Sequence, residues 1–370
     1  MGLLRVILAL SVVLAHLGGF FGWTIAGGFA AVQMFYIISG FYMATILTEK
    51  YDPRRDIAVF YSNRSLRIYS AYWAVLLISL VAYYVIHAAG KGGWWQYVAD
   101  NAHHISAPGK LWLVLTNLLV VGQESTLFMK LGADGLMFSP DVPGGDVPIW
   151  RMMPIPQAWT LSLELMFYAL APFLARLRTP GLVAVAAASI ALRIAVYAMG
   201  YQNDPWLSRF FPHELALFVM GMLARRFYDA HMDKITHNVQ IGLVVAFFAV
   251  TAVMRTIMEA VDPQGIEVNA VIWPYYLAAI VVVPCLFQLT RNSAWDSKLG
   301  NYSYPLYLTH WIVLTFYDAF AQDWGLPPMG SPLRVLICVA ATFALSWVII
   351  VSVEAPTDRY RQRRAAAAHA

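Results

Sequence analysis

The chain contains 370 residues, of which 60% are hydrophobic and only 12% are charged, with a formal net charge of +4. Soluble domains are about 45–50% apolar and about 25% charged, so this composition indicates an all-α polytopic membrane protein. The apolar segments are too long for the strands of a membrane barrel, which need only about 9–11 residues. The small positive charge gives no reason to expect nucleic acid as a partner.

Ten apolar segments are long enough to cross a bilayer, the one at 211–225 only just. A shorter run, residues 111–121, predicts a re-entrant or surface helix. All of these helices are expected to form one domain, residues 1–370. The predicted spans lie near residues 5–22, 27–47, 68–89, 157–175, 181–199, 211–225, 239–257, 270–290, 302–321 and 333–353.

Lysines and arginines are concentrated in alternate connections between these spans, as the positive-inside rule requires of cytoplasmic loops. Arg54 and Arg55 follow the second span, for example, and Arg225 and Arg226 follow the sixth. The pattern places both termini in the cytoplasm and the long segment 90–156 on the outer side.

The first span begins with Arg5 and contains His16 within its apolar run. At a rise of ~1.5 Å per residue, His16 lies about 17 Å along the helix from Arg5, past the middle of a hydrocarbon layer ~30 Å thick. An ionisable side chain at that depth is costly and marks a candidate functional site. The alternative is a histidine whose two nitrogens are both hydrogen-bonded by neighbouring helices.

Arg64 and Arg67 stand at the cytoplasmic entrance of the third span and, being three residues apart, share one face of a helix. The backbone N–H groups of a helix N-terminus favour anions. This pattern is typical of a site for a phosphorylated ligand from the cytosol. The alternative is a pair of snorkelling arginines that only obey the positive-inside rule.

Glu164 lies within the fourth span, in its outer half, and His310 lies within the ninth. A buried carboxylate must be neutral or paired, and an imidazole or a guanidinium is the obvious partner. Both residues can instead be structural, Glu164 in an ion pair between helices and His310 among the tyrosines of its own helix. Weaker candidates, for which packing roles serve equally well, are Arg193, His213, Glu214 and Asp318.

Several catalytic motifs are missing from the sequence. It contains no G-x-x-x-x-G-K-[ST] phosphate loop, no H-E-x-x-H zinc motif and no G-x-S-x-G nucleophile turn. His103 and His104 lack the companion ligands of a metal site, so we predict no metal. Ser39 and Gly40 are expected to form a notch at which helices pack closely.

Six short motifs occur in the order found in one family of membrane enzymes. They are spread over essentially the whole length of the chain. On them the protein resembles the acyltransferase-3 family of integral-membrane O-acyltransferases, in a stand-alone form without a fused SGNH domain. It departs from the family at Ser70, where proline is common, and at Tyr36, which replaces a phenylalanine. The motifs are Arg5 and His16 with ten residues between them, QMFYIISGFYMA, NRSLRIYSAYW, WTLSLELMFY, GNYSYPLYLTH and VEAPTDR.

The resemblance implies an enzyme that moves an acyl group, most often acetyl, from cytoplasmic acyl-CoA to a hydroxyl of an extracytoplasmic glycan or glycolipid. Acetyl-CoA is then the co-substrate and no metal is required. The expected location is a bacterial inner membrane, with polysaccharide biosynthesis proteins as a further class of partner. In this interpretation His16 is the catalytic base or acyl carrier, and Glu164 orients it. Arg5, Arg64 and Arg67 bind the cofactor. His310, Trp159 and Tyr302 have substrate-binding or structural polar roles.

Two other functions are consistent with the same residues. In a proton-coupled transporter or flippase of a glycan or lipid-linked sugar, the buried charges would form a proton relay. Arginines clustered at one membrane face beside a single deep histidine argue for the enzyme, and the two halves show no matched pair of broken segments typical of inverted repeats. In a subunit that only scaffolds a polysaccharide synthase, substitutions of His16 and Arg64 would be tolerated.

Overall fold

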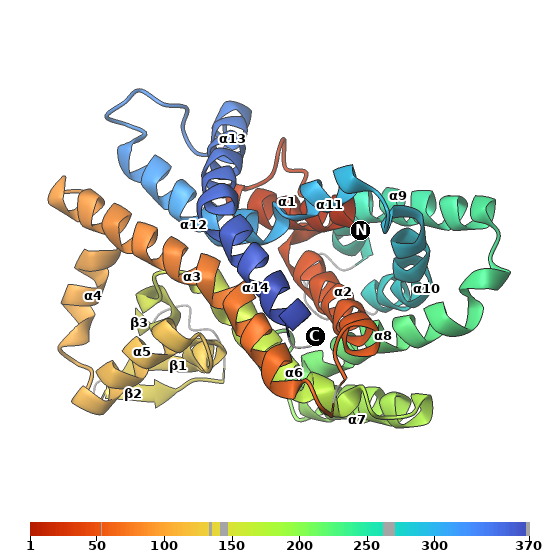
Figure 1. Ribbon diagram of the computed structural model, residues 1–370. Helices are drawn as coiled ribbons and strands as arrows, with labels where there is room; N and C mark the ends of the chain where they lie inside the picture. The colour runs from red at the N-terminus through yellow and green to blue at the C-terminus, as the bar shows by residue number, and fades with distance from the viewer. Residues whose placement is uncertain (53, 133–134, 141–146, 262–270, 368–370) are drawn as a thin grey trace.

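The computed structural model describes residues 1–52, 54–132, 135–140, 147–261 and 271–367, and it is mostly helical (Figure 1). A helix lies at each of the ten predicted spans, although the first residue of the predicted span 270–290 is outside the described residues. The ten helices are α1 (Gly2–Leu17), α2 (Gly27–Glu49), α3 (Ile57–Ala88), α6 (Trp159–Leu174), α7 (Thr179–Ala198), α8 (Phe211–His231), α9 (His237–Val261), α10 (Ile272–Thr290), α12 (Ser303–Phe320) and α13 (Pro332–Ile349).

Six helices of the described chain are long and apolar enough to cross a membrane by themselves, which makes this a helical, multi-pass membrane protein. The count of ten crossings and the cytoplasmic position of the termini remain predictions. The six are α2, α3, α7, α9, α10 and the continuous helix Pro332–Arg364, in which α13 runs through a π-helical turn (Ile350–Glu354) into α14 (Ala355–Ala367).

The central helix of the bundle is α2. It is the most buried of the six long apolar helices and packs against α1 on one side and α8 on another. Its side chains are apolar around the whole circumference, as is typical of a helix enclosed by other helices. α2 therefore reaches the interior from which any buried site must be built.

Two glycines allow α2 and α8 to cross closely. A Cβ atom on Gly40 would lie 1.9 Å from the carbonyl oxygen of Phe218, and one on Gly221 would lie 1.9 Å from the carbonyl oxygen of Ile37. Gly40 thus lies in the close helix contact that the sequence predicts, because small residues let membrane helices approach one another.

Replacement of Gly221 by alanine is expected to destabilise the protein by about 1–3 kcal/mol, because the added methyl group meets backbone rather than a movable side chain. Gly242 in α9 is the matched control, since a Cβ there would meet nothing within 4 Å. Thermal unfolding of the detergent-solubilised protein measures the difference. Equal unfolding temperatures for Gly221→Ala and Gly242→Ala would show that the crossing tolerates a side chain.

The end of α1 differs from the prediction. The apolar pattern extends the first span to about residue 22, but the helix ends at Leu17 because Gly18 and Gly19 adopt positive φ angles of 82° and 81°. His16 therefore lies in the last turn of α1, exposed on one side, and not deep within a longer span.

The described residues of the segment 90–156 form a small unit of their own beside α3 (Figure 1). The C-terminal carbonyl groups of α5 accept hydrogen bonds from Tyr69, Tyr72 and Trp73 of α3, at 2.5, 2.6 and 2.9 Å. The apolar face of α5 stays exposed, as a re-entrant or a surface helix would require. Its elements are α4 (Trp94–Ala102), α5 (Ala107–Leu119), the short helices Gln123–Phe128, Ile149–Met152 and Pro156–Ala158, and an antiparallel sheet, in the order β2-β1-β3, of β1 (Met129–Gly132), β2 (Gly135–Phe138) and β3 (Val147–Pro148).

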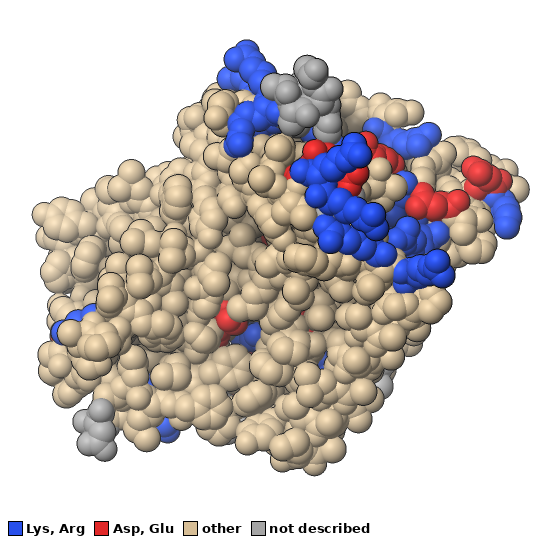
Figure 2. Space-filling view, turned by 60° about the horizontal axis from the view of Figure 1, so that its bottom comes forward, with Lys and Arg blue, Asp and Glu red and all other residues tan. Residues whose placement is uncertain are grey.

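Charged side chains are distributed very unevenly over the surface. In Figure 2, lysines and arginines gather at one end of the face shown, and the broad area below them is almost free of charge. Such a surface fits a protein whose apolar sides contact lipid and whose basic end lies at one membrane boundary.

Two shorter connecting helices complete the described part of the fold, Met232–Lys234 and α11 (Ala294–Gly300).

Candidate active site

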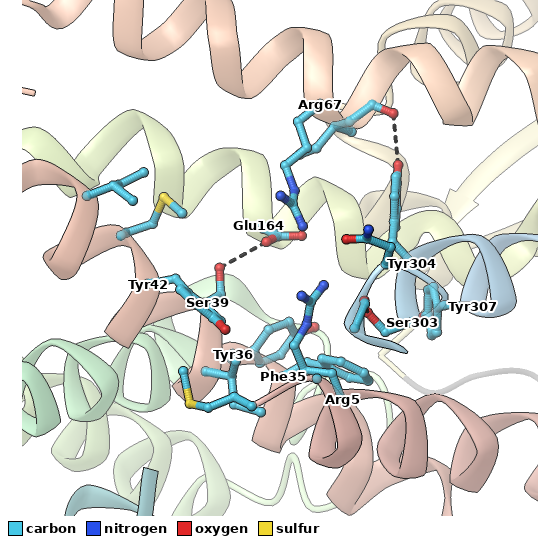
Figure 3. A pocket seen from close by; sticks show the side chains of 18 of the residues that line it. Arg5, Phe35, Tyr36, Ser39, Tyr42, Arg67, Glu164, Ser303, Tyr304 and Tyr307 are labelled. Carbon is cyan, nitrogen blue, oxygen red and sulfur yellow. Dashed lines mark hydrogen bonds between the residues drawn. The ribbon is translucent and has the colours of Figure 1, made fainter. Parts of the chain in front are cut away.

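A cavity of about 450 Å³ lies between α1, α2, α3, α6, α10, α11 and α12 (Figure 3). It brings together side chains that are far apart in the sequence. Arg5 comes from α1, Arg64 and Arg67 from α3, and Glu164 from α6. Four of the residues predicted to form a site therefore share one cavity. Its other polar lining residues include Tyr36, Ser39, Tyr42, Thr160, Tyr168, Ser303, Tyr304 and Tyr307.

Glu164 is held in place by two hydroxyl groups. Ser39 donates a hydrogen bond of 2.9 Å to its carboxylate, and Tyr168, one turn further along α6, donates another. The guanidinium group of Arg67 points toward the same carboxylate (Figure 3). Glu164 thus belongs to the arginine-lined part of the cavity.

Positive charge dominates this cavity. The guanidinium group of Arg5 lies 6.0 Å from the ring centroid of Tyr42, and the Nε atom of Arg64 is buried without a hydrogen-bond partner among the described residues. In the same part of the chain, none of the three arginines forms an ion pair. Because buried guanidinium groups require partners, this lining suits an anionic ligand, above all one that carries phosphate.

One part of the prediction for these arginines is wrong. The sequence pattern places them at a helix N-terminus, but α3 begins at Ile57, and its first turns pack through buried Phe60, so residues 57–67 extend the helix before the predicted span. The backbone N–H groups near Arg64 and Arg67 lie inside the helix and are not free to bind an anion. Binding must therefore depend on the side chains alone.

Beyond the cavity, His16 and His310 form a pair. His310 Nε2 lies 3.2 Å from His16 Nδ1, and the two rings stack with their centroids 5.0 Å apart. His310 is fully buried, whereas His16 is exposed on one side, and its ring is perpendicular to that of Trp311, 5.4 Å away between centroids.

The contacts of this pair select one tautomer of each ring. The carbonyl oxygen of Leu306 lies 3.3 Å from His310 Nδ1 and can only accept a hydrogen bond, so Nδ1 carries the proton. His310 Nε2 is therefore left as an acceptor. His16 Nδ1 is then the donor, shared between His310 and the Val12 carbonyl oxygen at 3.0 Å. The Nε2 atom of His16 carries the free lone pair and meets no partner among the described residues. It is placed to act as a base.

Tyr307 connects the cavity to the histidine pair. Its side chain lines the cavity, and its ring centroid lies 5.9 Å from that of His310. His16 itself does not line the cavity, and the described hydrogen bonds of Glu164 do not reach it. The position that the resemblance assigns to Glu164, beside His16 Nδ1, is occupied by His310 instead.

The remaining predicted residues lie in different places. Trp159 begins α6, and its ring lies under the guanidinium group of Arg209, 4.6 Å from the ring centroid to the guanidinium carbon. Tyr302 packs against Phe343 and does not line the cavity, although the next two residues along the chain do.

The weaker candidates all have structural partners. Arg193 and Glu214 form a buried ion pair, and Asp318 pairs with Arg334 at 2.7 Å. His213 Nδ1 lies 2.7 Å from the carbonyl oxygen of Trp206. These contacts hold helices and loops together.

Sequence reasoning missed several polar residues of this region. Tyr168 has a readable signal, because it follows Glu164 by four residues and so shares its helix face. Ser39 and Tyr307 lie within the family motifs, but no spacing separates them from the other serines and tyrosines of these membrane helices. Arg209 lies in a loop and carries no signal that separates it from other loop arginines.

Fold and site together define a class: a helical membrane protein with a cationic internal cavity and a histidine pair beyond it. The family model described as Acyltransferase domain matches residues 1–351, so the chain belongs to this family and is an acyltransferase.

Two similar proteins were found among curated sequences. Nodulation protein 10 of Rhizobium leguminosarum bv. viciae is 24% identical over 86% of this chain and 80% of its own length. The "Putative membrane-bound transacylase BcsY" of Komagataeibacter xylinus is 26% identical over 92% of this chain and 78% of its own. No solved structure gives a significant match.

Proposed function

We propose that this protein is a membrane O-acyltransferase that transfers an acyl group, acetyl in the first instance, from acyl-CoA to a hydroxyl of a glycan or glycolipid. One observation carries the proposal: a cationic cavity and a histidine pair lie end to end, with Tyr307 between them. Membership of the acyltransferase family and the transacylase name of the Komagataeibacter relative support it.

The donor is an anionic thioester. Its phosphates supply the negative charge that Arg5, Arg64 and Arg67 require, through charge-assisted hydrogen bonds. The pantetheine arm is uncharged, and the cavity also presents apolar side chains such as those of Val32 and Leu161. The thioester then lies at the end of the cavity near Tyr307, next to the histidine pair.

His16 Nε2 removes the proton from the acceptor hydroxyl. The oxygen attacks the thioester carbonyl carbon, a C–O bond forms, and the C–S bond breaks as the tetrahedral intermediate collapses. The imidazolium returns its proton to the CoA thiolate, so His16 is regenerated. If His16 carries the acyl group instead, the same Nε2 atom is the nucleophile. His310 holds the reactive tautomer, and Glu164 balances the arginines rather than orienting His16.

In the proposed orientation the ten helices cross a bacterial inner membrane, both termini are cytoplasmic, and residues 90–156 lie outside. The chain forms one acyltransferase domain. The arginine-lined end of the cavity, which includes residues of α11 and the first turn of α1, faces the cytoplasm. His16, in the last turn of α1, faces the acceptor on the other side. Polysaccharide biosynthesis proteins are the expected source of that acceptor.

The test is acetyl-CoA consumption by the purified protein in lipid vesicles, measured as free CoA thiol. We expect thiol release to depend on the protein and to rise when envelope glycan is added, with labelled acetyl groups recovered on the glycan. A protein that neither binds nor consumes acetyl-CoA contradicts the donor assignment. Proton flux across the vesicle membrane in that case favours a proton-coupled transporter.

A further inference from the structure

Arg209 occupies an unusual position in the loop between α7 and α8. Its Nε atom donates hydrogen bonds to both oxygens of Asp204, at 2.7 and 2.6 Å, and its guanidinium plane lies over the ring of Trp159. Ser208 donates a further hydrogen bond of 2.8 Å to Asp204. The orientation of the guanidinium group is therefore determined from two sides, by the ion pair and by the indole ring.

The other edge of this group carries the two terminal nitrogens of the guanidinium. The described residues offer no hydrogen-bond partner to Nη1 or Nη2 of Arg209, and its side chain is 24% exposed. Nη1 and Nη2 are the two nitrogens with which arginine binds carboxylate or phosphate in a fork. The contacts with Asp204 and Trp159 hold the side chain in place and leave this fork open.

The loop that carries Arg209 is itself anchored. Trp206 packs against Phe128 of the segment 90–156, with ring centroids 5.1 Å apart, and its carbonyl oxygen contacts His213 Nδ1 at 2.7 Å. Arg209 is thus presented by a supported loop, so little ordering is needed when a ligand binds.

A short chain of contacts leads from Arg209 to the histidine pair. Trp159 is followed by Thr160, which hydrogen-bonds the Tyr307 hydroxyl at 2.8 Å, and the Tyr307 ring neighbours His310. Arg209 is therefore linked to the histidine pair through Trp159 and Tyr307, and it does not line the cavity that holds the other arginines.

We propose that the Nη1 and Nη2 atoms of Arg209 bind an anionic group of the acceptor, a carboxylate or a phosphate, and so position its hydroxyl beside His16. The identification of this ligand as the acceptor rests on the proposed function. The acceptor is then an acidic or phosphorylated sugar rather than a neutral one.

Binding of small sugars in the absence of acyl-CoA tests this subsite. The probes are methyl β-D-glucuronoside, glucose 6-phosphate and methyl β-D-glucoside, titrated into the protein in lipid nanodiscs by calorimetry. We expect at least one anionic sugar to bind about 10-fold or more tightly than the neutral one, as hydrogen bonds to a charged group allow. Comparison of the two anionic sugars distinguishes carboxylate from phosphate.

Arg209→Gln should bind all three sugars alike, and Arg209→Lys, which keeps the charge and can keep the contact with Asp204, should retain part of the preference. Arg151→Gln is the matched control, because Arg151 is an exposed arginine whose guanidinium carbon lies 5.6 Å from the ring centroid of Trp150. It should leave the preference unchanged.

Equal or undetectable binding of the three sugars by the wild type overturns the subsite, as does a preference that survives in a folded Arg209→Gln protein. If Arg209→Gln fails to fold, Arg209→Lys takes its place. In that case, a preference for anionic sugars as strong as in the wild type counts against recognition by the two guanidinium nitrogens. Acetyl-CoA consumption is a separate readout. If it persists while the sugar preference is missing, only the subsite fails.

Discussion

Replacement of His16 by glutamine is expected to abolish acyl transfer while leaving acyl-CoA binding intact. The substitution removes the only lone pair that the histidine pair presents to an acceptor, and a positioned base contributes about 10²- to 10⁴-fold to a rate. His16 does not line the cavity, so the KM for the donor should stay within about two-fold. Steady-state release of CoA thiol with varied acetyl-CoA measures both constants.

His87→Gln is the control for this substitution. His87 lies exposed in the last turn of α3 and should tolerate glutamine without loss of rate. If His16→Gln keeps more than about a tenth of the wild-type kcat, the loss is smaller than a general base explains. His16 would then have a structural role, as the scaffold interpretation requires.

Replacement of Arg67 by glutamine is expected to act on the donor instead. It removes a charge-assisted hydrogen bond inside a cavity, which corresponds to about a 10- to 100-fold increase in the KM for acetyl-CoA, with a much smaller change in kcat. Direct binding of CoA should weaken by a similar factor. The effect arises because Arg67 shares the cavity with Arg5 and Arg64 and points toward Glu164 (Figure 3).

The matched control for Arg67 is Arg178→Gln, since Arg178 is exposed at the start of α7 and does not line the cavity. It should change neither constant. A fall in kcat without a change in KM for Arg67→Gln would contradict donor binding and would place Arg67 at the reacting atoms.

The two substitutions together separate the ends of the site. His16→Gln should retain donor binding without turnover, and Arg67→Gln should retain turnover at saturating donor. A transporter would not show this division, because both residues would then affect the same proton flux.

The positions of the helices could be predicted from the sequence, because in lipid an apolar run of sufficient length has to satisfy its backbone internally as a helix. The same local reasoning selected His16 and Glu164 as ionisable side chains that are costly to bury. It selected Arg64 and Arg67 as two basic residues on one face of a helix, and Arg5 as the residue that begins the first span. It failed at two helix ends: Gly18 ends α1 early, and α3 begins at Ile57, well before the start of the predicted span 68–89.

Only the tertiary structure decided which of these side chains meet. Helix periodicity says which residues share a face, but not which helix that face contacts, so neither the pairing of His16 with His310 nor the hydrogen bond from Ser39 to Glu164 could be read from spacing. Arg209 lies in a loop, where no period applies, and its position over Trp159 depends on how α6 and α8 pack.

The sequence by itself determined a helical membrane acyltransferase with a set of candidate residues. Contacts between residues up to 294 positions apart decided how those residues divide into a cationic cavity and a histidine pair, because such contacts arise from packing and not from local spacing.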